Sequence, residues 1–311
     1  MKTVRLDPTE DGLAQAAEVL RRGALLSFPT ETVYGLGADA RDGKAVAAVF
    51  AAKGRPSFNP LIVHLSDADR AADYVIWSDT AAILASAFWP GPLTLVLPLK
   101  EGHALSGLVT AGLDTVAVRV PAHPTARALL RSFDGPVAAP SANPSGKISA
   151  TTADHVLAGL DGKIAAVLDD GPCPVGLEST IVGLAGEKPA LLRAGGLPQE
   201  AIEQALGYTI DVASGPDITA PGQMTSHYAP AAAVRLNAET AREGEVMLGF
   251  GKVDGDLNLS PAGDLTEAAA NLFDHLHRLD ALKRPIAVAP VPETGLGRAI
   301  NDRLRRAAAP R

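Results

Sequence analysis

The sequence predicts a mixed α/β (α+β) fold in which helices cover a sheet, followed by a second and smaller α/β unit. Two kinds of apolar pattern alternate along the 311 residues: short runs typical of strands and longer stretches with helical period. The length exceeds that of one typical domain. A Pro-, Gly- and Ser-rich stretch begins near residue 212. We therefore expect a first domain over 1–211, a linker over 212–231 and a small domain over 232–311.

The first elements follow from capping residues and periodicity. Asp7 is the expected N-cap of a helix that Pro8 enters and Gly23 ends. A short apolar strand over 24–28 follows. It runs into residues 29–37, which are polar and contain glycine, so we expect a loop there and not a core strand.

The rest of the first domain mixes both element types. The expected helices cover 45–52, 80–88, 124–132 and 152–159, and the expected strands cover 61–65, 93–97, 115–120, 137–139, 165–168 and 180–184. The small domain has expected strands at 234–236, 245–250 and 286–289 and helices at 265–282 and 297–307. Three arginines near its end, Arg303, Arg305 and Arg306, predict a solvated helix face, with a functional basic patch as the alternative.

Composition narrows the class of protein. Apolar residues make up 47% and charged residues 20%, which is typical of a water-soluble globular protein. Cys173 is the single cysteine, so an internal disulfide and a multi-thiolate zinc site are excluded. No signal-peptide pattern or membrane-spanning run is found, and a cytoplasmic location is expected. The net charge of −7 argues against a protein coated with nucleic acid.

Several familiar catalytic motifs are missing from the sequence. It contains no P-loop, no G-x-G-x-x-G fingerprint, no H-E-x-x-H and no G-x-S-x-G. If the protein uses ATP, the phosphates must therefore be held by a less common arrangement.

Two polar segments that flank expected strands are the first candidates for a site. In K-G-R-P-S-F-N-P (53–60), Lys53 and Arg55 can hold two cations over one anionic group, although a basic helix end explains the bare triplet as well. In A-P-S-A-N-P-S-G (139–146), Ser and Asn follow a buried strand, where ligands often bind, although a plain turn has the same composition.

Two further segments and two single residues complete the candidates. The segments L-E-S-T (177–180) and L-L-R-A-G-G (191–196) each place a polar group beside a strand. His64, on an apolar strand, is by default a core histidine. Arg119 lies inside a run of β-branched residues, so its guanidinium must be paired or bind an anion.

Taken in order, these motifs resemble the YrdC family. The matching segments are F-P-T-E-T-V-Y-G-L-G (28–37), K-G-R-P-S-F-N-P-L-I-V-H (53–64), P-S-A-N-P-S-G (140–146), E-S-T-I-V (178–182) and L-L-R-A-G-G (191–196). The linker segment P-G-Q-M-T-S-H-Y-A-P (221–230) and the small domain resemble the longer, two-domain members.

The resemblance implies a fold and an activity. The fold would be a twisted mixed sheet with an open concave face, followed by a small Rossmann-like domain. The activity would be that of a nucleotidyltransferase that makes L-threonylcarbamoyl-AMP from L-threonine, bicarbonate or CO₂ and ATP, with release of pyrophosphate. Mg²⁺ would accompany ATP without a protein-bound metal cage. The product would pass to other proteins that modify an adenosine in tRNA.

The resemblance also implies a role for particular residues. The residues expected to be catalytic, at the reacting centre and at the ATP phosphates, are Lys53, Arg55, Ser141 and Asn143. Those expected along ATP are Arg55, Asn59, Thr115, Ala139, Ser149, Arg193 and Tyr228. Those expected around threonine are Thr32, His64, Arg119, Ser141 and Ser179, with Arg119 on the carboxylate. Tyr228 is expected to fold over the site and exclude water.

Two other functions compete with this one. The first is a related carbamoyltransferase domain that also forms an adenylate, although its accompanying parts would bring many cysteines. The second is a non-catalytic RNA-binding module. Threonine-dependent consumption of ATP separates both from the expected enzyme.

Overall fold

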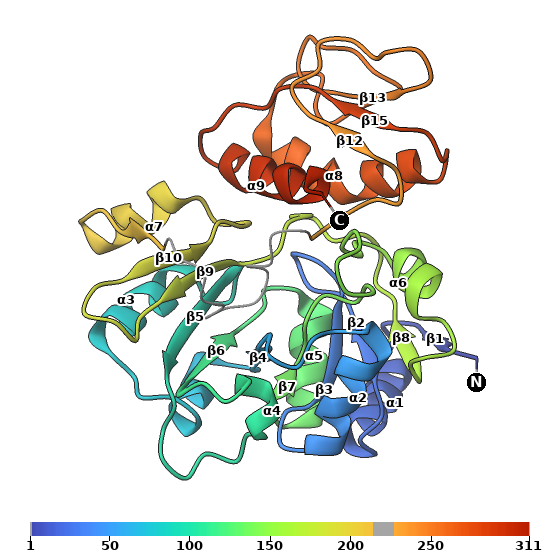
Figure 1. Ribbon diagram of the computed structural model, residues 1–311. Coiled ribbons are helices and arrows are strands. Elements are labelled where there is room, and N and C mark those ends of the chain that lie inside the picture. Colours follow the sequence, from blue (N-terminus) through green and yellow to red (C-terminus); the bar gives the residue numbers. More distant parts are fainter. Residues whose placement is uncertain (1, 214–226, 311) are drawn as a thin grey trace.

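Two β-sheets organise the chain in the computed structural model, which describes residues 2–213 and 227–310. The larger sheet has the strand order β1-β8-β2-β3-β7-β4-β6-β5-β9-β10-β11, and the smaller has the order β12-β15-β13-β14 (Figure 1). Residues 214–226, most of the predicted linker, lie outside the described residues.

The larger unit holds most of the elements. They are β1 (Val4–Leu6), α1 (Glu10–Arg21), β2 (Leu26–Phe28), β3 (Gly35–Asp39), α2 (Gly43–Lys53), β4 (Ile62–His64), α3 (Asp79–Phe88), β5 (Leu93–Pro98), α4 (Gly107–Thr110), β6 (Thr115–Arg119), α5 (Pro124–Phe133), β7 (Val137–Ala138), α6 (Ala153–Leu160), β8 (Ala166–Leu168), β9 (Thr180–Gly183), β10 (Ala190–Arg193), α7 (Gln199–Leu206) and β11 (Asp211–Val212), with a 3₁₀ turn over Ala68–Asp73. Parallel pairs such as β4–β6 and antiparallel pairs such as β5–β6 both occur, so the sheet is mixed as predicted.

The smaller unit is a parallel sheet with two long helices. Its elements are β12 (Val234–Arg235), β13 (Val246–Gly249), β14 (Leu257–Asn258), α8 (Leu265–Asp280), β15 (Ile286–Val288) and α9 (Gly297–Ala308). Figure 1 shows α8 and α9 on the side of this sheet that faces the larger unit. The Rossmann-like relationship stays a prediction.

The two faces of the large sheet are covered unequally. One face carries the main core, to which α2, α3 and α6 contribute Val49, Leu84 and Val156. On the other face, α1 and α5 cover only one end of the sheet. At β4, β5, β6 and β9 that face carries a small cluster of four buried apolar residues, Ile62, Val96, Ala117 and Ile181. Polar side chains next to this cluster are therefore placed at an open part of the sheet.

Most predicted elements are present within one to three residues, but three details differ. Helix α1 begins after Thr9 and not at Asp7, because the Thr9 side chain accepts a hydrogen bond from the Gly12 amide at 3.1 Å. No separate element was predicted at β1, α4, β10, α7, β11 or β14, or at the 3₁₀ turn over Ala68–Asp73. The third difference concerns residues 35–37.

The prediction that residues 29–37 form no core strand is wrong at its end. Gly35–Asp39 forms β3, which pairs with β2 and is largely buried. A Cβ atom at Gly37 would lie 2.9 Å from both Phe28 Cε1 and Val137 Cγ1. Gly37 thus leaves room for the neighbouring side chains of Phe28 and Val137 to pack against the strand, and it does not form a loop.

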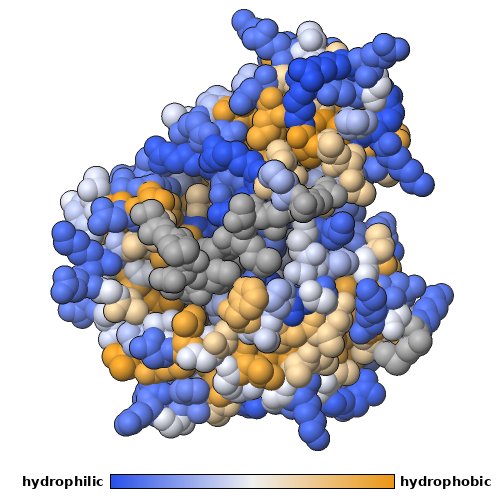
Figure 2. Space-filling model, in the orientation of Figure 1, coloured by the Kyte–Doolittle hydropathy of each residue, from blue (hydrophilic) through white to orange (hydrophobic). Residues whose placement is uncertain are grey.

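The two units share an apolar core. Val33, Ile148 and Leu177 of the larger unit belong to the same buried cluster as α8 and β13. Gly176, at φ +73°, allows this approach, because a Cβ atom there would lie 2.4 Å from Ala269 O on α8. Within the residues described, no helix is long and apolar enough to cross a membrane. Figure 2 shows hydrophilic side chains around the outer edges of both units on the visible face.

Candidate functional site

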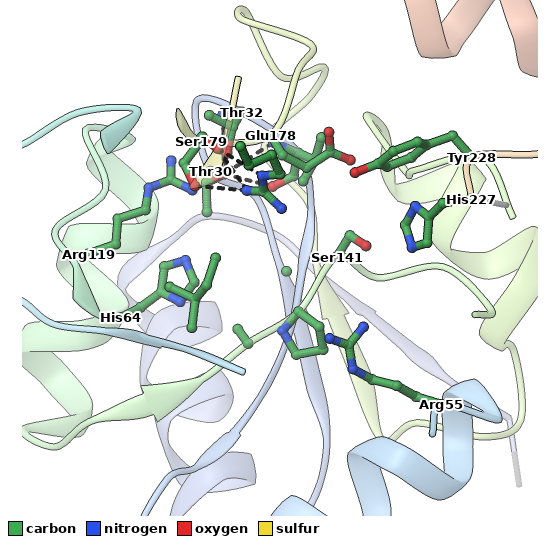
Figure 3. A pocket seen from close by; sticks show the side chains of 16 residues that line it. Thr30, Thr32, Arg55, His64, Arg119, Ser141, Glu178, Ser179, His227 and Tyr228 are labelled. Carbon is green, nitrogen blue, oxygen red and sulfur yellow. Dashed lines mark hydrogen bonds between the residues drawn. The ribbon is translucent and has the colours of Figure 1, made fainter. Parts of the chain in front are cut away.

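A polar pocket lies on the open part of the large sheet. It is lined by Thr30, Thr32, Val33, Gly35, Arg55, Ile62, His64, Arg119, Ala139, Pro140, Ser141, Glu178, Ser179, Arg193, His227 and Tyr228 (Figure 3). Nine of the predicted site residues are in this set: Thr32, Arg55, His64, Arg119, Ala139, Ser141, Ser179, Arg193 and Tyr228. The structure therefore brings together residues up to 196 positions apart in sequence, from Thr32 to Tyr228.

Strand alternation places the first pair of polar side chains. Val63 and Val118 point into the main core, so their neighbours His64 and Arg119 must point to the opposite, open face. His64 and Arg119 are also register partners on the parallel strands β4 and β6. Burial lowers the pKa of His64 to about 3, with a contribution from the nearby Arg119 charge. The His64 imidazole is consequently neutral at physiological pH.

Arg119 is paired within the protein. Its Nη2 donates to Glu31 Oε1 at 2.7 Å and its Nε donates to Gly91 O at 3.3 Å. Both members of the ion pair are buried. We predicted that this guanidinium is either paired or binds an anion, and the structure shows a pair, with Glu31 in the loop before β3. Only part of the guanidinium is left to meet a ligand.

Hydroxyl groups surround this arginine and are already ordered. Thr94 and Ser179 share a hydrogen bond of 2.7 Å between their side chains, and so do Thr30 and Thr32. Arg193 donates from Nη2 to Ser179 O at 2.7 Å. Burial is the main cause that lowers the pKa of Arg193. This half of the pocket thus offers fixed hydroxyls beside two cations.

The opposite half is basic as well. Arg55 follows α2 and donates from Nη2 to Pro60 O at 2.9 Å, and burial lowers its pKa to about 10. Lys53 does not line the pocket. Its Nζ donates to the carbonyls of Ser141, at 2.6 Å, and of Asn143. Lys53 therefore holds the loop that presents Ser141, and burial followed by the Arg55 charge lowers its pKa.

His227 and Tyr228 close the pocket on one side, as Figure 3 shows. Their rings meet edge to face with centroids 4.0 Å apart. Tyr228 has φ +60°, a left-handed conformation that a bulky residue rarely adopts. Its hydroxyl and His227 Nδ1 are buried with no hydrogen-bond partner among the described residues. Burial lowers the pKa of His227 to about 3.

Glu178 joins the pocket to the smaller unit. It accepts hydrogen bonds from Ser149 Oγ on one carboxylate oxygen and from Arg303 Nε, at 2.9 Å, on the other. Arg303 lies on α9 and is 0% exposed. The prediction of a solvated face at Arg303 is therefore wrong. The charge of the helix face was visible in the sequence, but the buried carboxylate that receives it comes from the loop before β9, 125 residues away in the chain.

Five predicted site residues lie outside the pocket lining. Lys53 and Asn143 support the loop after β7, and Ser149 bonds to Glu178. Asn59 is fully buried, and neither of its amide atoms has a partner in the part of the chain described. Thr115 shares a face with Arg119 but lies four residues back along β6, roughly 13 Å away.

The sequence reasoning missed several residues that the structure places in or next to the pocket. They are Thr30, Glu31, Glu178, His227 and Arg303. Two carried a usable signal: Glu31 and Glu178 are acids in otherwise buried segments, and each such acid needs a cation. Arg303 carried none, because an arginine on a polar helix face is usually solvated.

The described residues hold no group of three or more His, Cys, Asp or Glu side chains placed to bind a metal ion. The two carboxylates nearest the pocket, Glu31 and Glu178, are each bonded to an arginine.

Comparisons with known proteins match both units. A family model described as "Telomere recombination", for proteins of the Sua5, YciO and YrdC type, matches residues 18–195. A second model, "Threonylcarbamoyl-AMP synthase, C-terminal domain", matches residues 197–309, so it begins before the boundary at 211 that we predicted.

Individual relatives match along nearly the whole chain. A threonylcarbamoyl-AMP synthase of Bacillus subtilis is 42% identical over 98% of this chain and 95% of its own. One of Pyrococcus abyssi is 42% identical over 94% of this chain and 92% of its own. A crystal structure of Pyrococcus abyssi Sua5 complexed with L-threonine matches with a TM-score of 0.90 at 39% identity, over 99% of this chain and 98% of that one.

Proposed function

Because the chain belongs to the Sua5/YciO/YrdC family and carries the C-terminal domain of threonylcarbamoyl-AMP synthases, we propose that it synthesises L-threonylcarbamoyl-AMP. The substrates are L-threonine, bicarbonate or CO₂ and ATP, and pyrophosphate is released. The observation that carries this proposal is the match of both units, in order, to relatives of that name.

The chemistry suits the groups found in the pocket. The threonine amine captures CO₂ and gives a carbamate, and a carbamate oxygen attacks the α-phosphorus of ATP while pyrophosphate leaves. No step needs a nucleophile from the protein. Catalysis then depends on orienting two anionic reactants and on neutralising charge at the phosphates. Three pocket arginines, Arg55, Arg119 and Arg193, supply positive charge for both tasks.

The two halves of the pocket suggest where each substrate binds. The fixed hydroxyls of Thr32 and Ser179, next to His64 and Arg119, match the hydroxyl, amine and carboxylate of threonine. The ATP phosphates would then lie toward Arg55, with Ser141 between the two substrates. Mg²⁺ would enter bound to ATP. Tyr228 would limit water at the mixed anhydride.

The wider role follows from the product. A threonylcarbamoyl adenylate is an activated acyl donor, and we infer that a separate transferase passes the group to an adenosine of tRNA. A cytoplasmic location belongs to the same proposal.

Pyrophosphate release with and without L-threonine tests the proposed function. The purified chain, ATP, Mg²⁺ and bicarbonate are expected to release pyrophosphate in a threonine-dependent way. Arg55→Ala is expected to lower kcat/KM at least about 100-fold, the effect of losing one preorganised charge-stabilising group. Arg278→Ala, an exposed arginine on α8, is the matched control and should leave the rate unchanged.

A folded wild-type protein that binds ATP without threonine-dependent release would overturn the proposed activity. In that case RNA affinity that falls steeply with salt would favour the RNA-binding alternative.

A further inference from the structure

Arg303 comes from the smaller unit and contacts two residues that line the pocket. It is fully buried, although it stands on a helix whose neighbouring Arg305 is exposed. Its Nε donates to Glu178 at 2.9 Å, and its Nη1 donates to Asp302 on the same helix at 2.7 Å. Within the described residues Nη2 has no partner.

The contact with Glu178 extends to the loop after β7. One oxygen of Glu178 accepts from Arg303 and the other from Ser149, so the carboxylate is held from two sides. Because Glu178 lines the pocket, Arg303 sets the position of a pocket wall that belongs to the other unit.

The contact with Tyr228 is of a different kind. The Arg303 guanidinium carbon lies 5.0 Å from the centre of the Tyr228 ring, within the range of a cation–π interaction. Phe273 of α8 lies 5.6 Å from the same ring. Tyr228 has an unfavourable left-handed backbone, so contacts from the smaller unit must help to keep it in place.

We propose that Arg303 is a positioning residue for the nucleotide, so that the ATP half of the pocket is complete only when the smaller unit is docked. Arg303 acts through Glu178 and Tyr228 and does not touch the reacting atoms. The inference rests on the proposed function for the identity of the ligand.

Other contacts already hold the two units together, so the ion pair of Arg303 and Glu178 is not needed for docking alone. Val33, Ile148 and Leu177 bury apolar surface between the units, and His277 Nε2 lies 3.0 Å from Ser149 O. The loss of Arg303 should therefore disturb the pocket more than the docking of the units.

Equilibrium binding to the full-length chain tests the proposal. Arg303→Gln is expected to weaken ATP binding at least tenfold and to raise the KM for ATP by a similar factor, while the Kd for L-threonine changes less than about twofold. Arg303→Lys keeps the charge but loses the planar fork, and should lie between the two. Arg305→Gln, on the same helix, should match the wild type.

The pH profile adds a readout that a mechanical role would not move. Burial raises the pKa of Glu178, and the Arg303 and Arg193 charges lower it below its ordinary value. In Arg303→Gln the carboxylate loses the larger of these two positive charges and keeps Arg193, beside the neutral His227 and Tyr228. The acid limb of kcat/KM for ATP is therefore expected to move to higher pH.

Unchanged ATP affinity and an unchanged pH profile in folded Arg303→Gln would overturn the proposal. Arg303 would then be only a structural contact between the two units. If that variant does not fold, Arg303→Lys decides, and wild-type affinity for ATP would overturn it equally. If the wild-type chain binds ATP but shows no threonine-dependent turnover, only the proposed activity is refuted. If it binds no ATP, both the proposed activity and the role of Arg303 are refuted.

Discussion

The two halves of the pocket are built differently. On the β4–β6–β9 side, several polar groups are bonded to one another, Arg119 to Glu31 and Ser179 to Thr94, whereas His64 Nδ1 is buried with no partner among the described residues. On the side of the linker residues, Tyr228 Oη and His227 Nδ1 are buried without partners in the described chain.

We therefore regard the proposed threonine half as preorganised, whereas the proposed ATP half contains buried polar groups that a ligand can bond to. Buried polar groups without partners lower the stability of the ligand-free protein, and a ligand that bonds to them recovers that free energy. The proposed threonine half should therefore behave as part of the folded core, whereas the proposed ATP half should change most on binding.

The largest effect is expected from breaking the preorganised half at its ion pair. Arg119→Ala leaves Glu31 buried without its cation, and such losses lower the free energy of unfolding by about 3–5 kcal/mol. Urea denaturation of the ligand-free protein measures this. Arg70→Ala, which breaks the exposed pair with Asp134, should lower it by less than about 1 kcal/mol. Equal losses in the two variants would mean that Arg119 is not part of a preorganised core.

A smaller effect is expected from His64 as the pH falls. Its pKa is about 3 in the folded protein, against about 6.5 when unfolded, so below pH 6.5 only the unfolded state takes up the proton. The free energy of unfolding should fall by up to about 1.4 kcal/mol per pH unit from this residue between pH 6.5 and its folded pKa.

His64→Gln tests this by removing the titrating group. Urea titrations from pH 7.5 to pH 4.5 should show a shallower loss of stability in the variant than in the wild type. A difference between the two proteins that stays constant with pH would show that His64 does not titrate as its burial requires.

The smallest effects are expected from removing one hydroxyl in each half of the pocket. Thr94→Val removes the bond to Ser179 and should lower the free energy of unfolding by about 1 kcal/mol. Tyr228→Phe removes a buried hydroxyl that has no partner among the described residues, so it should be neutral or stabilise the ligand-free protein by up to about 1 kcal/mol. With saturating ATP, thermal unfolding should show less stabilisation of Tyr228→Phe than of the wild type. Destabilisation of ligand-free Tyr228→Phe would remove the distinction between the halves.

The sequence was a good guide to the strands and to the residues at their ends. Arg119 could be selected from its pattern, because a charged group inside a β-branched strand needs a partner, whereas His64 and Ser179 were selected only through the resemblance to the YrdC family. Strand β3 could not be predicted, because residues 35–37 have the composition of a turn. Their burial is explained only by the neighbouring side chains of Phe28 and Val137. The support of Ser141 by Lys53 was equally hidden, since the lysine bonds to backbone carbonyls that any sequence carries.

The sequence by itself determined the mixed α/β class and the order of the family motifs, because those properties depend on local period and on residue type. The resemblance carried by those motifs then pointed to nine of the residues that line the pocket. Only the tertiary structure decided which charges meet. Glu31 with Arg119, and Glu178 with Arg303, are separated by 88 and 125 residues. Pairing at that separation depends on sheet register and on the docking of the two units, and neither is written in any local stretch of sequence.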